Sequence, residues 1–205
     1  REYYDITRGK SDRNGKDLVG ELPNIFKTVE RLIGLGVAKK DALLAIVSNM
    51  ADFLRFSGIT AEIKGHLSKA GLIAKEADDT TGEANCIYGL GYIHLRESRN
   101  DEAKAAYEGA LALYRRVGHI MGEANCIAGF GWLAINEGRI DEGIGKADEA
   151  IGLYEKIKDR YNISYTYERL GNALSGKAGY EEAAKEYLRR AKEISESLPS
   201  SRSEG

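Results

Sequence analysis

Internal repetition constrains this chain more than any other feature of its sequence. The hexapeptide GEANCI begins at Gly82 and begins again at Gly122, 40 residues later. Leu90-Gly91 returns at the same spacing as Phe130-Gly131 and then as Leu170-Gly171. Weaker matches extend one further period upstream, so that four copies share one spacing. A fixed period of this length indicates an array of small, similar structural units.

Each copy of the repeat predicts two α-helices. In the clearest copy they span about 82–97 and 101–117, because apolar residues recur there at spacings of three and four. Three glycines fall inside the first helix of successive copies: Gly91, Gly131 and Gly171. A glycine within a helix costs about 1 kcal/mol relative to alanine. We therefore expect these positions to lack a side chain so that the neighbouring helix can approach closely.

Composition excludes several classes of partner. The 205 residues include 30 basic and 32 acidic side chains, giving a net charge of -2, which does not predict nucleic-acid binding. No apolar run approaches the roughly 20 residues that cross a bilayer, so no membrane partner is expected. Two cysteines do not make a disulfide framework, and no secretory signal follows Arg1, so we predict a cytoplasmic location. Because the first residue is not Met, we interpret the chain as part of a larger protein.

Several positions of the repeat resemble those of the tetratricopeptide repeat (TPR). They are Leu90-Gly91, Asp101-Glu102-Ala103, Tyr107 and Ala110. The resemblance implies an all-α fold, a right-handed superhelix (α-solenoid) of antiparallel helix pairs. The usual TPR period is about 34 residues. The longer period here is similar to that of repeats in kinesin light chains, G-protein-signalling modulators and the sensor regions of STAND-class NTPases.

The TPR resemblance also predicts where each segment of the chain begins and ends. We expect a linker and capping helix over 1–40, four helical hairpins over about 41–80, 81–120, 121–160 and 161–198, and a disordered tail over 199–205. Within the first segment, polar residues 9–20 predict a loop, and residues 22–35 predict an amphipathic helix with Pro23 near its first turn. In the last copy, Arg190 stands where a small residue is expected and Ala191 follows it. This predicts a slightly shifted last helix.

A second resemblance concerns the residues before the first repeat. Arg1-Glu2-Tyr3-Tyr4 and Glu21-Leu22-Pro23-Asn24-Ile25 are similar to the segment that joins the winged-helix and repeat regions of STAND NTPases. The resemblance implies a sensor region whose NTPase lies outside this sequence. No Gly-rich phosphate loop followed by Lys-Ser/Thr occurs in the chain, so we expect no nucleotide hydrolysis by it.

In TPR proteins the first helix of each pair lines a concave groove, and this implies a set of ligand-binding residues. They are Asn85, Tyr88, Tyr92, Arg96, Asn125, Trp132, Asn136, Tyr165, Glu168, Arg169 and Asn172. Aromatic and arginine side chains dominate binding energy at interfaces, and asparagine amides bond to peptide backbones. We expect Trp132 and Tyr92 to face the groove as neighbours; the competing interpretation is that such rings pack between helices.

One TPR subtype can be tested from these positions. Chaperone-binding TPR domains hold a C-terminal carboxylate with Lys, Asn and Arg. Here the corresponding places hold Tyr88, Tyr92, Gly129 and Tyr165, and only Arg169 is basic. A chaperone tail is therefore not the expected ligand.

Residues that carry chemistry in other proteins are few and scattered. Cys86 and Cys126 occupy equivalent places; a redox pair or half a metal site is one interpretation, and two small core residues the favoured one. No CxxC or HxxxH spacing occurs, so no metal is expected. Of the histidines, His66, His94 and His119, we expect His94 in the core and His119 in a loop. No catalytic arrangement results, so we predict no enzyme and no cofactor.

The sequence thus predicts a non-enzymatic TPR module that binds a protein or peptide, including another domain of its own parent chain. We expect it to serve as the sensor or scaffold part of a larger signalling protein. The alternative is a small-molecule sensor, because aromatic and amide groups also suit sugars and the related maltose-regulon activator recognises one. A closed pocket near Trp132 would favour the small molecule. The oligomeric state stays open.

Overall fold

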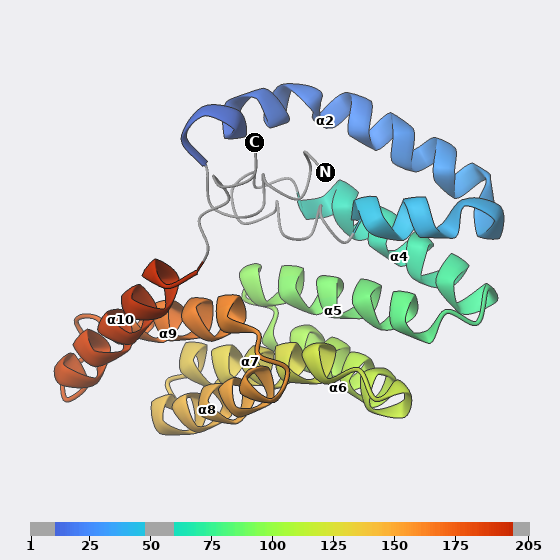
Figure 1. The fold of residues 1–205 in the computed structure, drawn as a ribbon. Coiled ribbons are helices and arrows are strands. Elements are labelled where there is room, and N and C mark those ends of the chain that lie inside the picture. The colour runs from blue at the N-terminus through green and yellow to red at the C-terminus, as the bar shows by residue number, and fades with distance from the viewer. Residues whose placement is uncertain (1–10, 48–59, 199–205) are drawn as a thin grey trace. The chain divides into compact units, whose positions relative to one another are not determined.

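A computed structural model describes residues 11–47 and 60–198, with side chains from residue 23 onward in the first range and from residue 61 in the second (Figure 1). Among these residues the secondary structure is helical apart from turns, and no strand occurs. The predicted tail at 199–205 and the segment at Arg1–Tyr4 lie outside the described residues. The chain divides into two compact units, Arg1–Val117 and Gly118–Gly205, called unit 1 and unit 2 below.

Unit 1 ends in a pair of helices preceded by a less regular region. Its elements are α2 (Ser11–Gly34), the short 3-10 helix η1 (Gly36–Lys39), a helical segment at 40–47, α4 (Thr60–Glu76), α5 (Thr80–Arg96) and α6 (Asn100–Val117). α5 pairs with α6, and α4 packs against α5. Val29 of α2 is fully buried, in one apolar cluster with Leu43 and Leu67. α2 therefore packs against the helices that follow it in unit 1, and its role as a capping helix stays a prediction.

The start of α2 differs from the sequence prediction. The helix begins at Ser11, so the loop expected over 9–20 is wrong for residues 11–20. Pro23 lies in the interior of this helix and not in its first turn. Polar residues do not break a helix by themselves, and one that has nucleated on an amphipathic segment extends at little cost per residue. The sequence pattern therefore located only the C-terminal part of α2.

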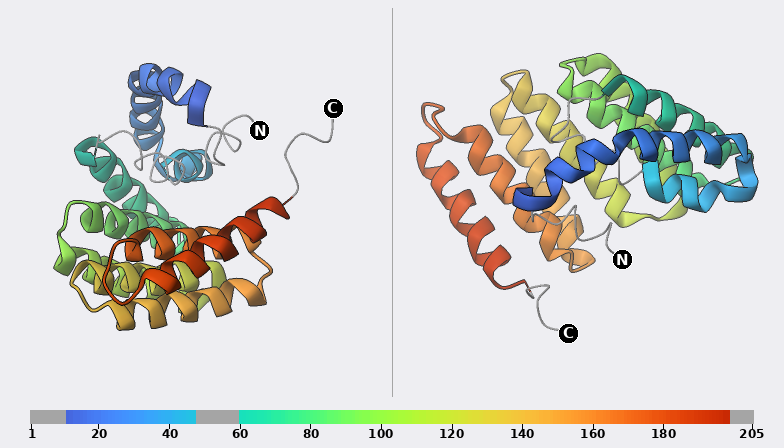
Figure 2. Two further views of the ribbon diagram at one scale, coloured as in Figure 1. Left: turned by 90° about the vertical axis from the view of Figure 1, so that its left-hand side faces the viewer. Right: turned by 90° about the horizontal axis from the view of Figure 1, so that it is seen from above.

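Unit 2 consists of two helix pairs that lie side by side (Figure 2). The helices are α7 (Ile120–Asn136), α8 (Ile140–Lys156), α9 (Arg160–Leu174) and α10 (Glu181–Glu196). α7 packs along α8, α9 packs along α10, and α8 joins the two pairs by packing on α9. α5, α7 and α9 begin at Thr80, Ile120 and Arg160, so the starts of these helices follow the repeat period of the sequence.

The glycines inside α5, α7 and α9 lie where the paired helix comes closest. A Cβ on Gly91 would lie 2.8 Å from a ring carbon of Tyr107. On Gly131 it would lie 2.9 Å from the backbone oxygen of Gly143, and on Gly171 it would lie 2.5 Å from a leucine side chain. The predicted packing requirement is confirmed, because a side chain at any of the three would push the helix pair apart.

The predicted shift of the last helix is also present. α10 begins at Glu181, one residue later than the repeat period predicts from the start of α8, because a longer connection follows a shorter α9. Gly176 and Gly179 take positive φ values of 79° and 86° in that connection. Ala191 is consequently buried while Arg190 is exposed. The extra residue returns a small side chain to the contact with α9.

The turns before α5, α7 and α9 share one capping position. Asp79, His119 and Asp159 stand one repeat period apart, and each side chain accepts a hydrogen bond from the backbone N–H three residues later, at 2.8, 3.0 and 3.0 Å. These bonds satisfy N–H groups that the helix itself leaves free. The bond from Gly82 N–H is the main reason that the pKa of Asp79 lies below its usual value. His119, expected in a loop, has a defined structural role there.

Candidate functional site

In unit 1 the predicted ligand-binding face of α5 is partly engaged by α6. Tyr114 donates a hydrogen bond from its hydroxyl to Oδ1 of Asn85 at 2.7 Å. The ring of Tyr88 lies 5.6 Å from that of Tyr107, between ring centroids. Tyr88 and Tyr92 are half-buried, and Arg96 is exposed. Of the predicted set on α5, Arg96 is exposed, while Asn85 and Tyr88 contact the paired helix α6.

The same asparagine–tyrosine bond occurs in unit 2. Tyr154, on α8, donates to Oδ1 of Asn125, on α7, at 2.6 Å. Burial of Tyr154 raises the pKa of its hydroxyl, which keeps it protonated as a donor. Because the carboxamide is planar, Oδ1 toward the tyrosine places the NH2 group on the other side. Asn125 is thus a hydrogen-bond donor with a fixed orientation. The asparagine is replaced in the last pair, where Tyr165 stands one repeat period after Asn125.

Trp132 is the aromatic member of the predicted set on α7. The residue is buried, with an exposed fraction of only 6%, so its indole is not an open contact surface. Within unit 2, the guanidinium of Arg169 lies over the indole, 4.3 Å from the ring centroid. This cation–π contact favours one orientation of the guanidinium. Whether Trp132 neighbours Tyr92 stays a prediction, since the two residues belong to different units.

α9 carries the accessible part of the predicted site. Glu168 and Asn172 are exposed, and Tyr165 and Arg169 are half-buried. Their spacing of three, one and three places them on one side of the helix. Tyr161, which the sequence prediction omitted, begins the same row four residues earlier and is 41% exposed. The i, i+4 spacing from Tyr165 is the signal that would have found it.

We define the α9 face as Tyr165, Glu168, Arg169 and Asn172, together with Asn125 and Asn136 of α7. Asn136 is exposed at the end of α7, and Asn125 is half-buried. The indole of Trp132 lies beneath this face and contacts the guanidinium of Arg169. The α9 face therefore combines five polar groups. The amide of Asn125 and the guanidinium of Arg169 are oriented by contacts with aromatic side chains. The carboxylate of Glu168 and the amides of Asn136 and Asn172 are exposed.

Solved structures show the same fold. The crystal structure of BtubC (BKLC) from P. vanneervenii is 18% identical over 94% of this chain and 78% of that chain, with a TM-score of 0.68. A kinesin-light-chain-type protein of nearly identical TPR-like repeats from Podosopora anserina is 14% identical over 95% and 94%, with a TM-score of 0.53. A single-substitution form of that protein is 14% identical over 95% and 93%, with a TM-score of 0.56. This chain has a TPR-like repeat fold.

The all-α, TPR-like prediction is thereby confirmed as a fold. At sequence identities of 14% and 18%, the similarity establishes the fold and does not establish a shared function. No protein-family model matches the chain, and no curated protein matches it.

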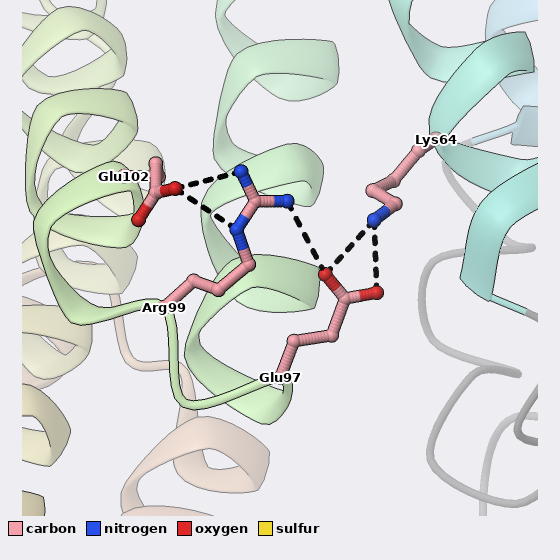
Figure 3. Close-up of polar contacts among 4 residues, drawn as sticks. All are labelled: Lys64, Glu97, Arg99 and Glu102. Atoms are coloured by element: carbon pink, nitrogen blue, oxygen red, sulfur yellow. Dashed lines mark hydrogen bonds and ion pairs between the residues drawn. The ribbon is translucent and has the colours of Figure 1, made fainter.

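A chain of ion pairs links three helices of unit 1 at their turn end (Figure 3). Lys64 of α4 lies 2.8 Å from a carboxylate oxygen of Glu97, and Arg99 lies 3.7 Å from Glu97 and 2.7 Å from Glu102. In unit 2, Arg139 pairs likewise with Glu137 and Glu142. Arg99 and Glu102 are exposed, so their pair contributes little stability. The recurrence of this arrangement at the TPR-like turn indicates a structural role in fixing its geometry.

The groups with reactive chemistry are buried or half-buried. Cys86 and Cys126 are both buried and unbonded to sulfur. Burial raises the pKa of Cys86 to about 12, which disfavours the thiolate needed by a nucleophile or metal ligand. Burial also lowers the pKa of His66 and of His94, and their Nδ1 atoms have no hydrogen-bond partner within the described part of the chain. Cys86, Cys126 and His66 are thus core side chains, and His94 is half-buried at the edge of the core.

Two searches of the described residues complete the survey. No group of three or more His, Cys, Asp or Glu in 23–47 and 61–198 is arranged to hold a metal ion. No helix within the described ranges is long and apolar enough to cross a membrane.

Proposed function

We propose that this chain is a non-enzymatic module that binds a polypeptide through the α9 face of unit 2. The observation that carries the proposal is the double preorganisation of this face. Tyr154 fixes the amide of Asn125, and Trp132 fixes the guanidinium of Arg169. Side chains already held in one rotamer lose less entropy when a ligand binds, so more of the contact energy is retained as affinity.

The chemistry of the face suits a peptide backbone. Every residue of an extended polypeptide offers one C=O acceptor and, except for proline, one N–H donor. Asn125 offers an oriented donor, and the exposed amide of Asn172 offers both a donor and an acceptor. Glu168 and Arg169, adjacent and of opposite charge, can each pair with a side chain of the ligand. TPR-like repeats are protein-interaction scaffolds in general, which supports a protein or peptide partner.

We further propose that the module is the sensor or scaffold part of a larger signalling protein of the STAND NTPase type. The support is the resemblance at Glu21–Ile25 and the GEANC-type repeats. In this arrangement the partner is a protein, a peptide or another domain of the parent chain, and the location is cytoplasmic. Binding at the α9 face would then change the activity of the attached NTPase.

The test is selection from a displayed peptide library on the whole chain, followed by affinity measurements with selected peptides. We expect Arg169→Ala combined with Asn172→Ala to weaken binding by about tenfold or more, which corresponds to about 1.4 kcal/mol. Lys185→Ala with Lys192→Ala, on the outer side of α10, is the matched control and should change nothing. Equal losses in both variants would contradict the α9 face. Failure to select any peptide, together with stabilisation by a sugar, would establish the small-molecule alternative.

A further inference from the structure

The exposed large apolar side chains of unit 2 gather at one end of its helices. They are Ile120, Met121, Ile157 and Tyr161, with exposed fractions of 39%, 41%, 36% and 41%. Ile120 and Met121 begin α7, Ile157 directly follows the last residue of α8, and Tyr161 lies in the first turn of α9. The bond between Tyr154 and Asn125 lies about one turn inward and ties the end of α8 to the start of α7. We call these four side chains, with the cations described next, the turn patch.

Unpaired positive charge coincides with this apolar surface. Lys156, Lys158 and Arg160 alternate along the chain with other residues of the turn and are all exposed. Among the residues that the structure describes, no carboxylate lies within ion-pair distance of these three. Arg160 donates instead to the hydroxyl of Ser197 at 2.5 Å. Lys158 takes a positive φ of 56° in the turn between α8 and α9.

Most other cations of unit 2 are already engaged. Six of them form ion pairs with carboxylates on their own helices or turns: Arg139, Lys146, Lys185, Arg189, Arg190 and Lys192. Arg169 lies over Trp132, and Lys177 is half-buried in the turn before α10. The turn patch thus gathers exposed cations around exposed isoleucine, methionine and tyrosine, and it is complementary to something acidic and apolar. Such charge complementarity raises association rates and selects partners, while the apolar contact supplies affinity.

We infer that the turn patch binds an acidic polypeptide segment that carries bulky apolar side chains. The inference does not depend on the proposed function, because the turn patch shares no residue with the α9 face. Apolar side chains of the segment would cover Ile157, Met121 and Tyr161, and its carboxylates would pair with Lys156 and Lys158. Burial of the apolar side chains contributes about 25 cal/mol per Å².

A polypeptide fits this patch better than an anionic membrane does. More than half of each of the four apolar side chains is already covered, so none protrudes far enough to insert into lipid. The carboxylates of Glu155 and Asp159 lie in the same turn as the lysines. A continuous anionic surface would be repelled by them, whereas a peptide can place each of its carboxylates beside a lysine.

The probe is a fluorescein-labelled peptide pool of about 12 residues rich in Asp, Glu, Leu and Phe, with a pool in which Lys replaces the acids as its control. We expect the whole chain to bind the acidic pool and not the basic one. Raising NaCl from about 50 to about 300 mM should weaken binding several-fold. Lys156→Glu with Lys158→Glu should weaken it by about tenfold or more. The variant keeps Arg160, and hence its bond to Ser197.

Matched variants keep the outcome interpretable. Lys185→Glu with Lys192→Glu changes the net charge equally on the outer side of α10 and should leave the affinity within about twofold. Ile157→Ser with Tyr161→Ser should lose binding without any change of charge. If charge reversal disturbs folding, seen as a lower melting temperature, Lys156→Gln with Lys158→Gln replaces it.

Three results would overturn the inference. One is equal binding of the acidic and basic pools. Another is an equal loss in the turn-patch and α10 variants. The third is co-sedimentation with phosphatidylserine vesicles that depends on Lys156 and Lys158, with no binding of the acidic pool. The variant Arg169→Ala with Asn172→Ala should bind the acidic pool normally, so a failure of the α9 face and a failure of the turn patch are distinguishable.

Discussion

α7 and α9 occupy the same place in successive copies of the repeat, yet they use their side chains differently. α7 buries eleven residues and contains one charged residue, Glu123. α9 buries six and contains three charged residues, Arg160, Glu168 and Arg169. Both begin after a capping side chain, and both use a glycine at the contact with the paired helix. The repeat thus determines where a helix lies, and the remaining side chains determine whether it serves the core or the surface.

The largest difference should appear when an aromatic side chain is removed from each helix. We expect Trp132→Ala to lower the free energy of unfolding by about 3–5 kcal/mol, because a buried indole is lost and Arg169 loses its support. Tyr161→Ala, on α9, should change it by less than about 0.5 kcal/mol. Urea unfolding followed by circular dichroism is the suitable measurement, since Trp132 is the single tryptophan. Similar losses in both variants would remove the distinction between the helices.

At the glycines the two helices should behave alike. Gly131→Ala and Gly171→Ala each place a Cβ within 3.0 Å of atoms of the paired helix, and we expect losses of about 1–3 kcal/mol. Gly145→Ala, in α8, meets nothing within 4 Å and should gain about 0.5–1 kcal/mol from helix propensity. Melting temperatures of the three variants test this. A gain at Gly131 would mean that the close contact is not a constraint.

Exchanging the caps should alter the two helices in opposite directions. Asp159→Ala removes the side chain that accepts from the first turn of α9, and we expect a loss of about 1 kcal/mol. His119→Asp supplies α7 with the residue found at the other two caps and adds a favourable charge at the helix start. It should gain up to about 1 kcal/mol in urea unfolding at neutral pH. Destabilisation by His119→Asp would show that the imidazole has a role beyond capping.

α7 and α9 also differ in the residue that precedes the capping side chain. Gly118 and Lys158 both take positive φ, 69° and 56°, but only glycine does so without steric cost. Lys158→Gly should therefore raise the free energy of unfolding by about 0.5–1 kcal/mol, and Gly118→Lys should lower it by a similar amount. Because Lys158→Gly also removes a cation of the turn patch, it should stabilise the protein while weakening acidic-peptide binding. If Lys158→Gly raised both stability and acidic-peptide affinity, or lowered both, Lys158 would not belong to the turn patch.

α5, the third helix at this repeat position, gives the smallest expected effect. Its His94 stands where α7 has Ala134 and α9 has Leu174, both fully buried. Burial lowers the pKa of His94 in the folded state, so the unfolded state binds more protons as the pH falls through the ordinary histidine range. Stability should therefore fall between pH 7 and 5, by no more than about 0.5 kcal/mol because solvent reaches part of the side chain. His94→Ala should flatten this slope in urea unfolding, and an unchanged slope would exclude His94 as its source.

Most of the fold could be predicted from the repeat. The period placed the helices, the recurring glycines located the closest contacts, and Arg190 followed by Ala191 indicated the shift of α10. The extent of α2 could not be predicted, because residues 11–20 are mostly polar and show no apolar residues at helical spacing, yet they are helical.

The candidate site was predicted less well, for a related reason. Helical spacing indicated which residues share a side of α7 and α9, but it did not show what covers them. Asn125 bonds to a tyrosine 29 residues away, and Trp132 lies under Arg169 of another helix. The turn patch was missed because its residues lie at helix ends, where exposure depends on how the turn is formed. The spacing of residues along one helix does not reveal which side chains of another helix they contact.

The glycines at the helix contacts also bear on how relatives of this protein should be compared. Any missense mutation in a glycine codon adds at least a Cβ. At Gly91, Gly131 and Gly171 every amino-acid replacement therefore places an atom too close to the paired helix. Purifying selection on packing alone would keep all three invariant in an alignment. Invariance there would report the closeness of two helices and not a ligand. Evolutionary traces of recognition should instead be sought at Tyr161 and Arg169, where the fold permits change.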